Sequence, residues 1–293
     1  MYESFYGFAE KPFSLTPDLK YLYRSESHAN ALDLLRYAIE RREGFVLITG
    51  EIGTGKTTLC RALIEHTNPC ILTALLLNPF LSEEDLLTGI LKDLGVVSTG
   101  EQRVAGRRPT KQELVNVLND FLLSLIPIGA RAVLIVDEAQ NLPLPILEQI
   151  RILSNLETDK EKLLQIIFVG QLNLVPLLRL PELRQLDQRI SVRHQLEPLK
   201  EEETAAYVAH RLTVGRPTRA VEFTHAALAE VHRHSGGNPR TINILCDRAL
   251  LTAYTAEMTR IGDDVITTAA EALELRTVEH RKPTWFHRLL RRS

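Results

Sequence analysis

The chain of 293 residues is poor in several features, and each shortage excludes a class of protein. Its three cysteines, Cys60, Cys70 and Cys246, are scattered through apolar segments, which predicts reduced thiols and argues against a disulfide framework. No uninterrupted apolar run approaches the roughly 20 residues that a transmembrane helix needs. The amino-terminal residues lack the basic start and apolar core of a signal peptide. We therefore expect a cytoplasmic protein.

The chain also lacks a strong charge of either sign. It has 35 Lys and Arg against 37 Asp and Glu, a formal net charge of −2, so no overall basicity points to nucleic acid. Its 44% hydrophobic and 25% charged residues are ordinary for a globular protein. The length allows one large domain or two modest ones.

The most informative stretch that is present is a glycine-rich loop of the form G-x-x-x-x-G-K-T. An apolar run over 45–48 precedes the loop and a helical pattern follows it, the context in which this motif indicates a phosphate-binding loop. The predicted cofactor-binding residues are Gly50, Glu51, Ile52, Gly53, Thr54, Gly55, Lys56, Thr57 and Thr58.

The residue types in this loop suit the chemistry of a polyphosphate such as ATP. Glycines let the backbone approach the phosphates and turn its N–H groups toward them. The helix N-terminus that follows adds a partial positive charge. Lys56 can reach the β- and γ-phosphates, and the Thr57 hydroxyl can bind Mg²⁺.

A second motif completes the predicted site. The apolar run over 132–136 is long enough for one buried parallel strand, and it ends in Asp137 and Glu138. Asp137 at a strand end can hold Mg²⁺ through water, and Glu138 can orient or deprotonate the attacking water. The alternative interpretation is a strand that ends in two solvated acids.

The pattern along the chain alternates between strands and helices as far as Glu197. The sequence therefore predicts an α/β fold, a parallel sheet flanked by helices, of the additional-strand P-loop type. A strand-and-helix unit lies between the loop and the Asp137 strand, so the two site-bearing strands are not consecutive. The expected elements are a helix over 26–42 stopped by Gly44, a strand over 70–77, a helix from Ser82 to Gly95, a helix from the capping box at Thr110 to 126, a helix over 145–157 and a strand over 165–169.

Beyond Glu197 the strand pattern stops and four segments look helical, over 201–213, 224–234, 239–256 and 263–276. These segments predict a small helical lid domain. The expected organisation is an aromatic and proline-rich extension over 1–24, the ATPase domain over 25–197, the lid over 198–277 and a basic amphipathic tail over 278–293.

With these motifs placed, the chain resembles the AAA+ ATPases from residue 1 to about 275. Within them it is most similar to the bacterial GspA/ExeA-type family of secretion, pilus-assembly and exosortase-locus ATPases. The stretches that carry the resemblance are 6–8, 11–13, 16–18, the loop over 50–58, 136–140, 168–171, 183–190, 236–240 and 242–246.

The resemblance implies further roles. Gln171, at the end of a strand beside the Asp137 strand, takes the position that senses the γ-phosphate. Arg189 is the candidate arginine finger from a neighbouring subunit, with Arg184 in reserve, and Arg240 matches the arginine that contacts phosphate from the lid. The alternative for each arginine is a solvated surface charge.

Three peripheral features leave two interpretations open. Phe13 or Tyr21 could lie over the adenine, or could pack the extension onto the core. The tail over 281–292, with its tryptophan and five basic residues, has the pattern of a peripheral membrane segment or is a frayed terminus. The arginines within 103–108 could face DNA or solvent.

The function expected from this resemblance is an ATPase that requires Mg²⁺, forms a homo-oligomer and drives or regulates assembly of a bacterial envelope apparatus. Type II secretion, a pilus or exopolysaccharide export would supply the partner protein, at the inner membrane if the tail binds there. The alternative is a DNA-binding ATPase regulator similar to the transposition ATPases. A third interpretation is a scaffold that binds ATP with little hydrolysis.

Overall fold

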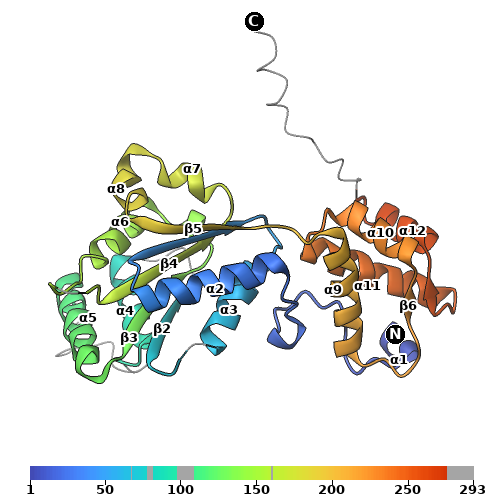
Figure 1. The fold of residues 1–293 in the computed structure, drawn as a ribbon, viewed down its shortest axis with the longest axis horizontal. Coiled ribbons are helices and arrows are strands. Elements are labelled where there is room, and N and C mark those ends of the chain that lie inside the picture. Colours follow the sequence, from blue (N-terminus) through green and yellow to red (C-terminus); the bar gives the residue numbers. More distant parts are fainter. Residues whose placement is uncertain (67, 78–81, 98–108, 160, 276–293) are drawn as a thin grey trace, which may run out of the picture. The chain divides into compact units, whose positions relative to one another are not determined.

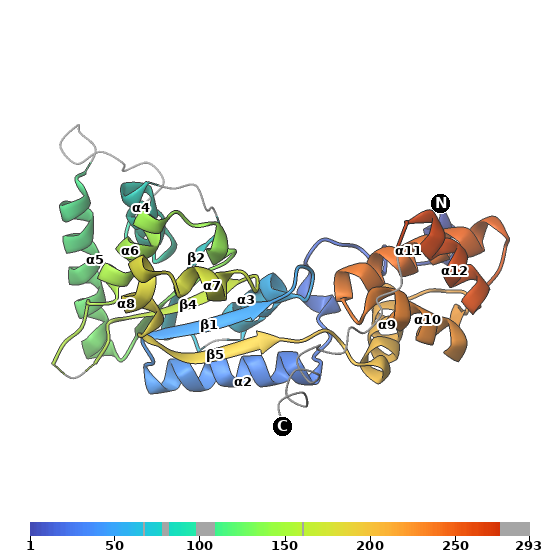
Figure 2. The same ribbon diagram turned by 90° about the horizontal axis from the view of Figure 1, so that it is seen from above.

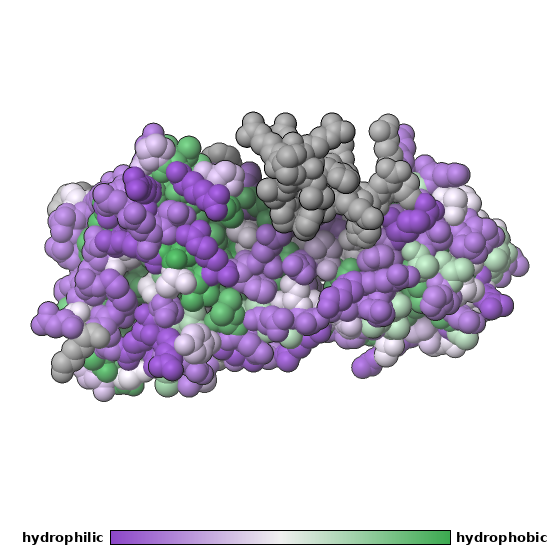
Figure 3. Space-filling model, turned by 45° about the horizontal axis from the view of Figure 1, so that its top comes forward, coloured by the Kyte–Doolittle hydropathy of each residue, from purple (hydrophilic) through white to green (hydrophobic). Residues whose placement is uncertain are grey.

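The computed structural model describes residues 1–66, 68–77, 82–97, 109–159 and 161–275 (Figure 1). The chain divides into two compact units: Pro17–Glu197 forms an α/β unit, and Met1–Thr16 joins the segment that begins at Pro198. In the described part of the chain, no helix has the length and apolar character needed to cross a membrane. The face in Figure 3 is largely hydrophilic, with apolar patches over the α/β unit.

The α/β unit is built on a five-stranded sheet in the order β2-β3-β4-β1-β5, and every neighbouring pair is parallel. The strands are β1 (Phe45–Gly50), β2 (Ile71–Leu76), β3 (Arg131–Val136), β4 (Leu164–Gly170) and β5 (Ile190–Leu196). Because β4 lies between β1 and β3, the two strands that lead into the predicted site are separated in the sheet. The predicted parallel sheet of the additional-strand type is confirmed.

Helices cover both faces of this sheet because alternate strand residues point to opposite sides. Val46 and Ile48 pack in one cluster with α2 (Glu26–Arg41) and α3 (Lys56–Glu65), whereas Phe45 and Leu47 pack on the other side of the sheet. Figure 2 shows α2 along one side of β1 and β5, with α6, α7 and α8 on the opposite side. The helices on that second side are α4 (Glu83–Asp93), α5 (Lys111–Leu125), α6 (Leu144–Leu153), α7 (Leu174–Leu178) and α8 (Arg184–Asp187).

The helix starts follow the local chemistry of the sequence. The side chains of Ser25, Ser82 and Thr110 each accept a hydrogen bond from a first-turn N–H, and Thr110 forms the predicted capping box with Glu113. α2 ends at Arg41, one residue from the predicted end, and Arg42 at φ 58°, not Gly44, forms its left-handed cap. The predicted end of α6 at residue 157 is wrong: the helix ends at Leu153, and the chain then enters the short pairing of Glu157 with Lys162.

The sequence does not predict β5, although β5 is an integral part of the sheet. Only Ile190 and Leu196, at its two ends, are buried, and the positions between them are polar or half-exposed. An edge strand pairs on one side only, so its sequence carries little of the apolar pattern that marks the inner strands.

The second unit contains α9 (Glu201–Gly215), α10 (His225–Ser235), α11 (Pro239–Thr255) and α12 (Asp263–Ala272), at the four predicted segments. It also contains β6 (Glu222–Phe223) and β7 (Arg260–Ile261), which pair in parallel and were not predicted. The helices bury one face each against their neighbours, as expected from their apolar spacing.

The amino-terminal residues belong to the core of this second unit. The helix α1 (Tyr2–Tyr6) buries Tyr6, whose hydroxyl donates to the Met258 carbonyl at 2.8 Å, and burial raises the pKa of Tyr6 to about 12. Phe13 is buried against Phe223 with ring centroids 6.4 Å apart. Residues 1–16 therefore pack in the same unit as the helices predicted to form a lid, while Tyr21, in the short helix η1 (Leu19–Tyr21), is buried in the α/β unit.

Replacing Tyr6 tests this packing. Tyr6→Ala should lower the free energy of unfolding by about 3–5 kcal/mol, the usual cost of removing a buried aromatic ring. Tyr6→Phe should cost about 1 kcal/mol because the Met258 carbonyl loses its donor. Tyr37→Phe, at an exposed position, is the matched control and should leave the denaturation midpoint unchanged. Equal midpoints for Tyr6→Ala and the parent would show that the segment is not part of this core.

Candidate functional site

The glycine-rich loop follows the buried strand β1 and leads into α3, as the motif predicts. Gly53 and Gly55 have φ values of 88° and 93°, which residues with a Cβ atom rarely adopt. A Cβ on Gly50 would lie 2.9 Å from Thr54 Oγ1 and 3.1 Å from the Leu196 carbonyl oxygen. The loop is thus closely wrapped, and its glycines are required by backbone angle or by contact.

Lys56, in the first turn of α3, reaches back across the loop to the residues at its start. Its Nζ donates to the carbonyl oxygens of Gly50 at 3.0 Å and Glu51 at 2.8 Å, and the residue is 5% exposed. Burial lowers the pKa of Lys56, and the carboxylates of Glu138 and Asp137 act in the opposite direction. The ammonium group is therefore held at the loop among carbonyl oxygens, and a phosphate would be a stronger partner for it.

Thr57 and Asp137 meet although β1 and β3 are not neighbours in the sheet. The Thr57 hydroxyl donates to Asp137 Oδ2 at 2.7 Å, and Asp137 Oδ1 accepts from the Glu138 N–H at 2.9 Å. Hydroxyl and carboxylate oxygens are the ligands that Mg²⁺ prefers, with waters and substrate phosphates completing its octahedron. The described residues form no cluster of three or more His, Cys, Asp and Glu suited to holding a metal by themselves. The pair therefore suits a Mg²⁺ ion that arrives with a phosphate ligand.

Glu138 sits next to this pair in an unusual backbone conformation. Its φ of 50° and ψ of 38° are left-handed, which costs a non-glycine residue about 1–3 kcal/mol unless its surroundings hold it there. Its carboxylate oxygen Oε2 accepts from Gln171 Nε2 at 3.2 Å and from Gln140 Nε2 at 2.5 Å. Two amide side chains thus set the direction of the Glu138 carboxylate.

Gln140 is a site residue that the sequence analysis did not single out. Its Oε1 accepts from the Gln171 N–H at 2.9 Å while its Nε2 donates to Glu138, so one amide joins the ends of β3 and β4. A Cβ on Gly170 would lie 2.7 Å from that oxygen, so the absence of a side chain at Gly170 makes room for Gln140. A polar residue two positions after the predicted base was the available signal.

Arg189 lies at the amino-terminal ends of the strands, whereas the loop lies at their carboxyl-terminal ends. Ile190 pairs with Phe45 at the start of β1, whereas the loop follows Gly50 at its end. Six strand residues span roughly 20 Å, so Arg189 is far from the loop of its own chain. Its Nη1 donates to Ser154 Oγ at 2.6 Å. Arg184, the reserve candidate, is exposed at the start of α8.

Arg240 lies in the second unit, as the second residue of α11, and its side chain is exposed. Asn238 caps this helix by accepting from the Arg240 N–H at 3.0 Å. Gly237, directly before this cap, meets a packing requirement. A Cβ on Gly237 would lie 2.0 Å from the Leu199 carbonyl oxygen.

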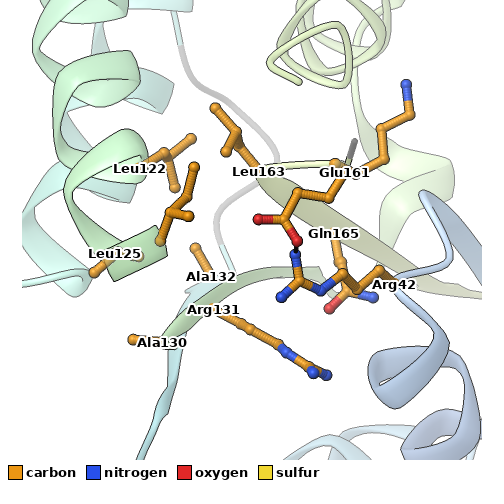
Figure 4. Close-up of a pocket in the computed structure, with 11 residues that line it drawn as sticks. Arg42, Leu122, Leu125, Ala130, Arg131, Ala132, Glu161, Leu163 and Gln165 are labelled. Atoms are coloured by element: carbon orange, nitrogen blue, oxygen red, sulfur yellow. Dashed lines mark ion pairs between the residues drawn. The ribbon is translucent and has the colours of Figure 1, made fainter. Parts of the chain in front are cut away.

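A hollow at the amino-terminal ends of the strands, away from the loop, is lined by none of these residues. It encloses about 310 Å³, open solvent included, and Figure 4 shows Arg42 directed at Glu161 with Gln165 beside them. Arg42 pairs with Glu161, and the Arg131 guanidinium donates to the Ile39 carbonyl at the end of α2 at 2.9 Å. These charged groups serve local pairing and helix capping.

Comparison with known proteins finds a matching domain model and a relative. A family model described as "AAA domain" matches residues 39–178, which include the loop, Asp137, Glu138 and Gln171. General secretion pathway protein A of Aeromonas hydrophila is 44% identical over 270 residues, which cover 92% of this chain and 48% of that protein. The chain thus spans about half the length of the curated relative it matches.

Solved structures share the fold. The Aeropyrum pernix ORC2 protein, in ADPNP–ADP complexes, has a TM-score of 0.66 at 15% identity, and the match covers 93% of this chain and 74% of the ORC2 chain. The Thermotoga maritima RuvB Holliday junction branch migration motor has a TM-score of 0.55 at 21% identity, covering 86% and 70%. Drosophila ORC bound to DNA has a TM-score of 0.62 at 19% identity, covering 92% and 67%.

The contact between Gly170 and Gln140 yields a stability prediction with a control of opposite sign. Gly170→Ala should lower the free energy of unfolding by about 1–3 kcal/mol because its Cβ would collide with Gln140 and Leu174. Gly89→Ala, inside α4 with open space around its Cα, should instead raise it by about 0.5–1 kcal/mol. Denaturant titrations measure both changes. A Gly170→Ala protein as stable as Gly89→Ala would contradict the packing described.

Proposed function

This chain is an AAA domain protein homologous to general secretion pathway protein A, and from that premise we propose that it binds ATP with Mg²⁺ and hydrolyses it. The observation that carries the proposal is the 2.7 Å hydrogen bond between Thr57 and Asp137. It brings the metal-binding groups of two separate motifs together beside the Lys56 ammonium and the Glu138 carboxylate. A strand that merely ended in two solvated acids would not place Asp137, which is buried, against the loop.

The loop and Lys56 would bind the phosphates. The N–H groups at the start of α3 and the helix dipole favour an anion at this point. Lys56 Nζ would exchange the Gly50 and Glu51 carbonyls for the β- and γ-phosphate oxygens, which offer a full negative charge. Thr57 and Asp137 would hold Mg²⁺, whose charge offsets that of the phosphates during transfer.

Glu138 would prepare the attacking water. Its carboxylate lies one residue beyond the metal-binding Asp137, where a water in line with the γ-phosphate can donate to it. Gln140 and Gln171 hold one of its oxygens, which leaves the other oxygen to accept that proton. Gln171 thereby connects the base with the position where the γ-phosphate would lie.

The placement of Arg189 supports action between subunits. Its own loop is roughly 20 Å away along β1, so Arg189 can stabilise a transferring phosphate only on a neighbouring copy of the chain. This requires a homo-oligomer in which the loop-distal edge of one α/β unit faces the loop of the next. Arg240, exposed on the second unit, would report the nucleotide state to that unit.

The biological setting that we propose follows the relative. General secretion pathway protein A matches nearly the whole of this chain, so we infer work on a bacterial secretion or related envelope apparatus, with a partner protein of that apparatus. The DNA-regulator alternative has only a shared fold behind it, in ORC and RuvB. The basic features over 103–108 and 281–292 lie outside the described residues.

The central test separates binding from turnover. Lys56→Ala should weaken ATP binding by at least about 2 kcal/mol, because a buried charge partner of the phosphates is lost. Glu138→Gln should bind ATP as the parent does and lower the turnover rate about 10²–10⁴-fold, the usual contribution of a general base. Glu40→Gln, at an exposed position, is the control. Parental turnover by Glu138→Gln would remove Glu138 as the base.

Mixing two inactive variants tests Arg189. Arg189→Ala alone should lower turnover by up to about 10³–10⁵-fold. Mixed with Glu138→Gln, it should regain activity, because some interfaces then combine an intact Glu138 with an intact Arg189. Arg184→Ala in the same assay tests the reserve candidate. If the Arg189→Ala protein alone turns over ATP as the parent does, Arg189 is not the finger; if the mixture stays inactive, it does not act across subunits.

A further inference from the structure

His28 contacts the back of the phosphate-binding loop from the first turn of α2. The residue is 4% exposed, and its ring nitrogens contact two different segments. Nδ1 lies 2.7 Å from Ser25 Oγ, and Nε2 lies 3.0 Å from the carbonyl oxygen of Thr54, 26 residues away in the sequence. His28 thus ties a helix start to the loop.

The chemistry of the two partners defines the tautomer. A carbonyl oxygen can only accept, so Nε2 must carry the hydrogen and donate it to Thr54. In the neutral ring Nδ1 then accepts from the Ser25 hydroxyl, whose oxygen also accepts from the His28 backbone N–H at 3.3 Å as the cap of α2. The neutral imidazole therefore satisfies both contacts, and the capping serine fixes the plane of the ring.

The bond to Thr54 sets the direction of the next amide. A trans peptide is planar, and its C=O and N–H groups point to opposite sides. While His28 holds the Thr54 carbonyl on the α2 side, the Gly55 N–H must point away from α2. Gly55 immediately precedes Lys56 at the start of α3, where the predicted phosphates would lie.

Gly55 itself is shaped by the same contact. Its φ of 93° is left-handed, and a Cβ there would lie 2.9 Å from His28 Nε2. The imidazole therefore occupies the space that a side chain at position 55 would need. The Thr54 side chain is also held, because its hydroxyl donates to the Glu51 carbonyl at 2.9 Å. The group whose direction depends on His28 is therefore the peptide between Thr54 and Gly55.

We propose that His28 is a positioning residue for the loop: its Nε2–H holds the Thr54–Gly55 peptide so that the Gly55 N–H faces the β-phosphate of a bound nucleotide. The inference rests on the proposed nucleotide binding and deepens it. Lys56 holds the Gly50 and Glu51 carbonyls only until its ammonium moves to the phosphates. The His28 contact, in contrast, does not involve a group that a phosphate would compete for. His28 therefore keeps the loop shaped while the nucleotide is bound.

Three replacements of His28 separate its donor from its bulk. A Gln side chain can place an amide N–H near the position of Nε2, whereas Asn reaches only as far as Nδ1 and Ala has no donor. ADP affinity should fall about tenfold in His28→Ala and His28→Asn, the usual effect of one lost hydrogen bond, and stay within about threefold in His28→Gln. His66→Ala, a histidine at the end of α3 with a half-exposed side chain, is the matched control.

The assay is a titration with fluorescent ADP, followed by ATP turnover at varied ATP concentration. Since the β-phosphate contact exists in both the ground state and the transition state, KM should rise about tenfold with kcat nearly unchanged. A loss of folded protein would instead lower kcat at constant KM. Thermal melting without nucleotide checks the fold of each variant, and the pair His28→Gln and His28→Asn still decides the question if His28→Ala fails to fold.

The ADP titrations distinguish a wrong nucleotide site from a wrong role for His28. If the parent binds no ADP, the nucleotide site itself is wrong. If the parent binds ADP and both His28→Asn and His28→Ala bind it equally well, the site stands and the role of His28 is wrong. If His28→Gln is as weak as His28→Asn, the imidazole acts through its bulk and the donor role is overturned.

Discussion

The hydrogen bond between the Thr57 hydroxyl and the Asp137 carboxylate is the interaction on which the site depends. β4 separates β1 from β3 in the sheet, so the groups that would bind the metal come from strands that do not touch. The wrapped loop after β1 carries Thr57 across this gap to the end of β3. The parallel order of the strands places all of these ends at one edge, and a buried core packs against each face of the sheet.

Two kinds of support keep the reactive groups of this edge in place. On the side of β3 and β4, Gln140 and Gln171 hold the Glu138 carboxylate, and the strained backbone of Glu138 is tolerated because these contacts define it. On the side of α2, the proposed role of His28 is to hold the loop through the Thr54 carbonyl. Both supports act through neutral amide or imidazole groups, which leaves the charged groups available for phosphate and metal.

Much of this fold could be predicted from the sequence because its signals are local. The glycines, Lys56 and Thr57 lie in one short motif, and the capping box of Thr110 and Glu113 marks the start of its helix within four residues. The missed features depend on tertiary contacts. Gln140 meets the Gln171 backbone 31 residues away, and Tyr6 is buried against a segment about 250 residues away. The edge strand β5 lacked an apolar pattern because one side of it has no strand neighbour. The catalytic, metal and phosphate roles of the site residues remain proposals, since a motif names residue types and does not show a reaction.

A crystal structure of the Glu138→Gln protein with ATP and Mg²⁺ would test the central claim most directly. The account predicts the triphosphate in the loop over 50–58, with Lys56 Nζ moved from the Gly50 and Glu51 carbonyls to the phosphate oxygens. It also predicts Mg²⁺ bound by the Thr57 hydroxyl, with the Asp137 carboxylate within one water of the ion. A triphosphate bound elsewhere, or a metal that contacts neither residue directly or through water, would contradict the account.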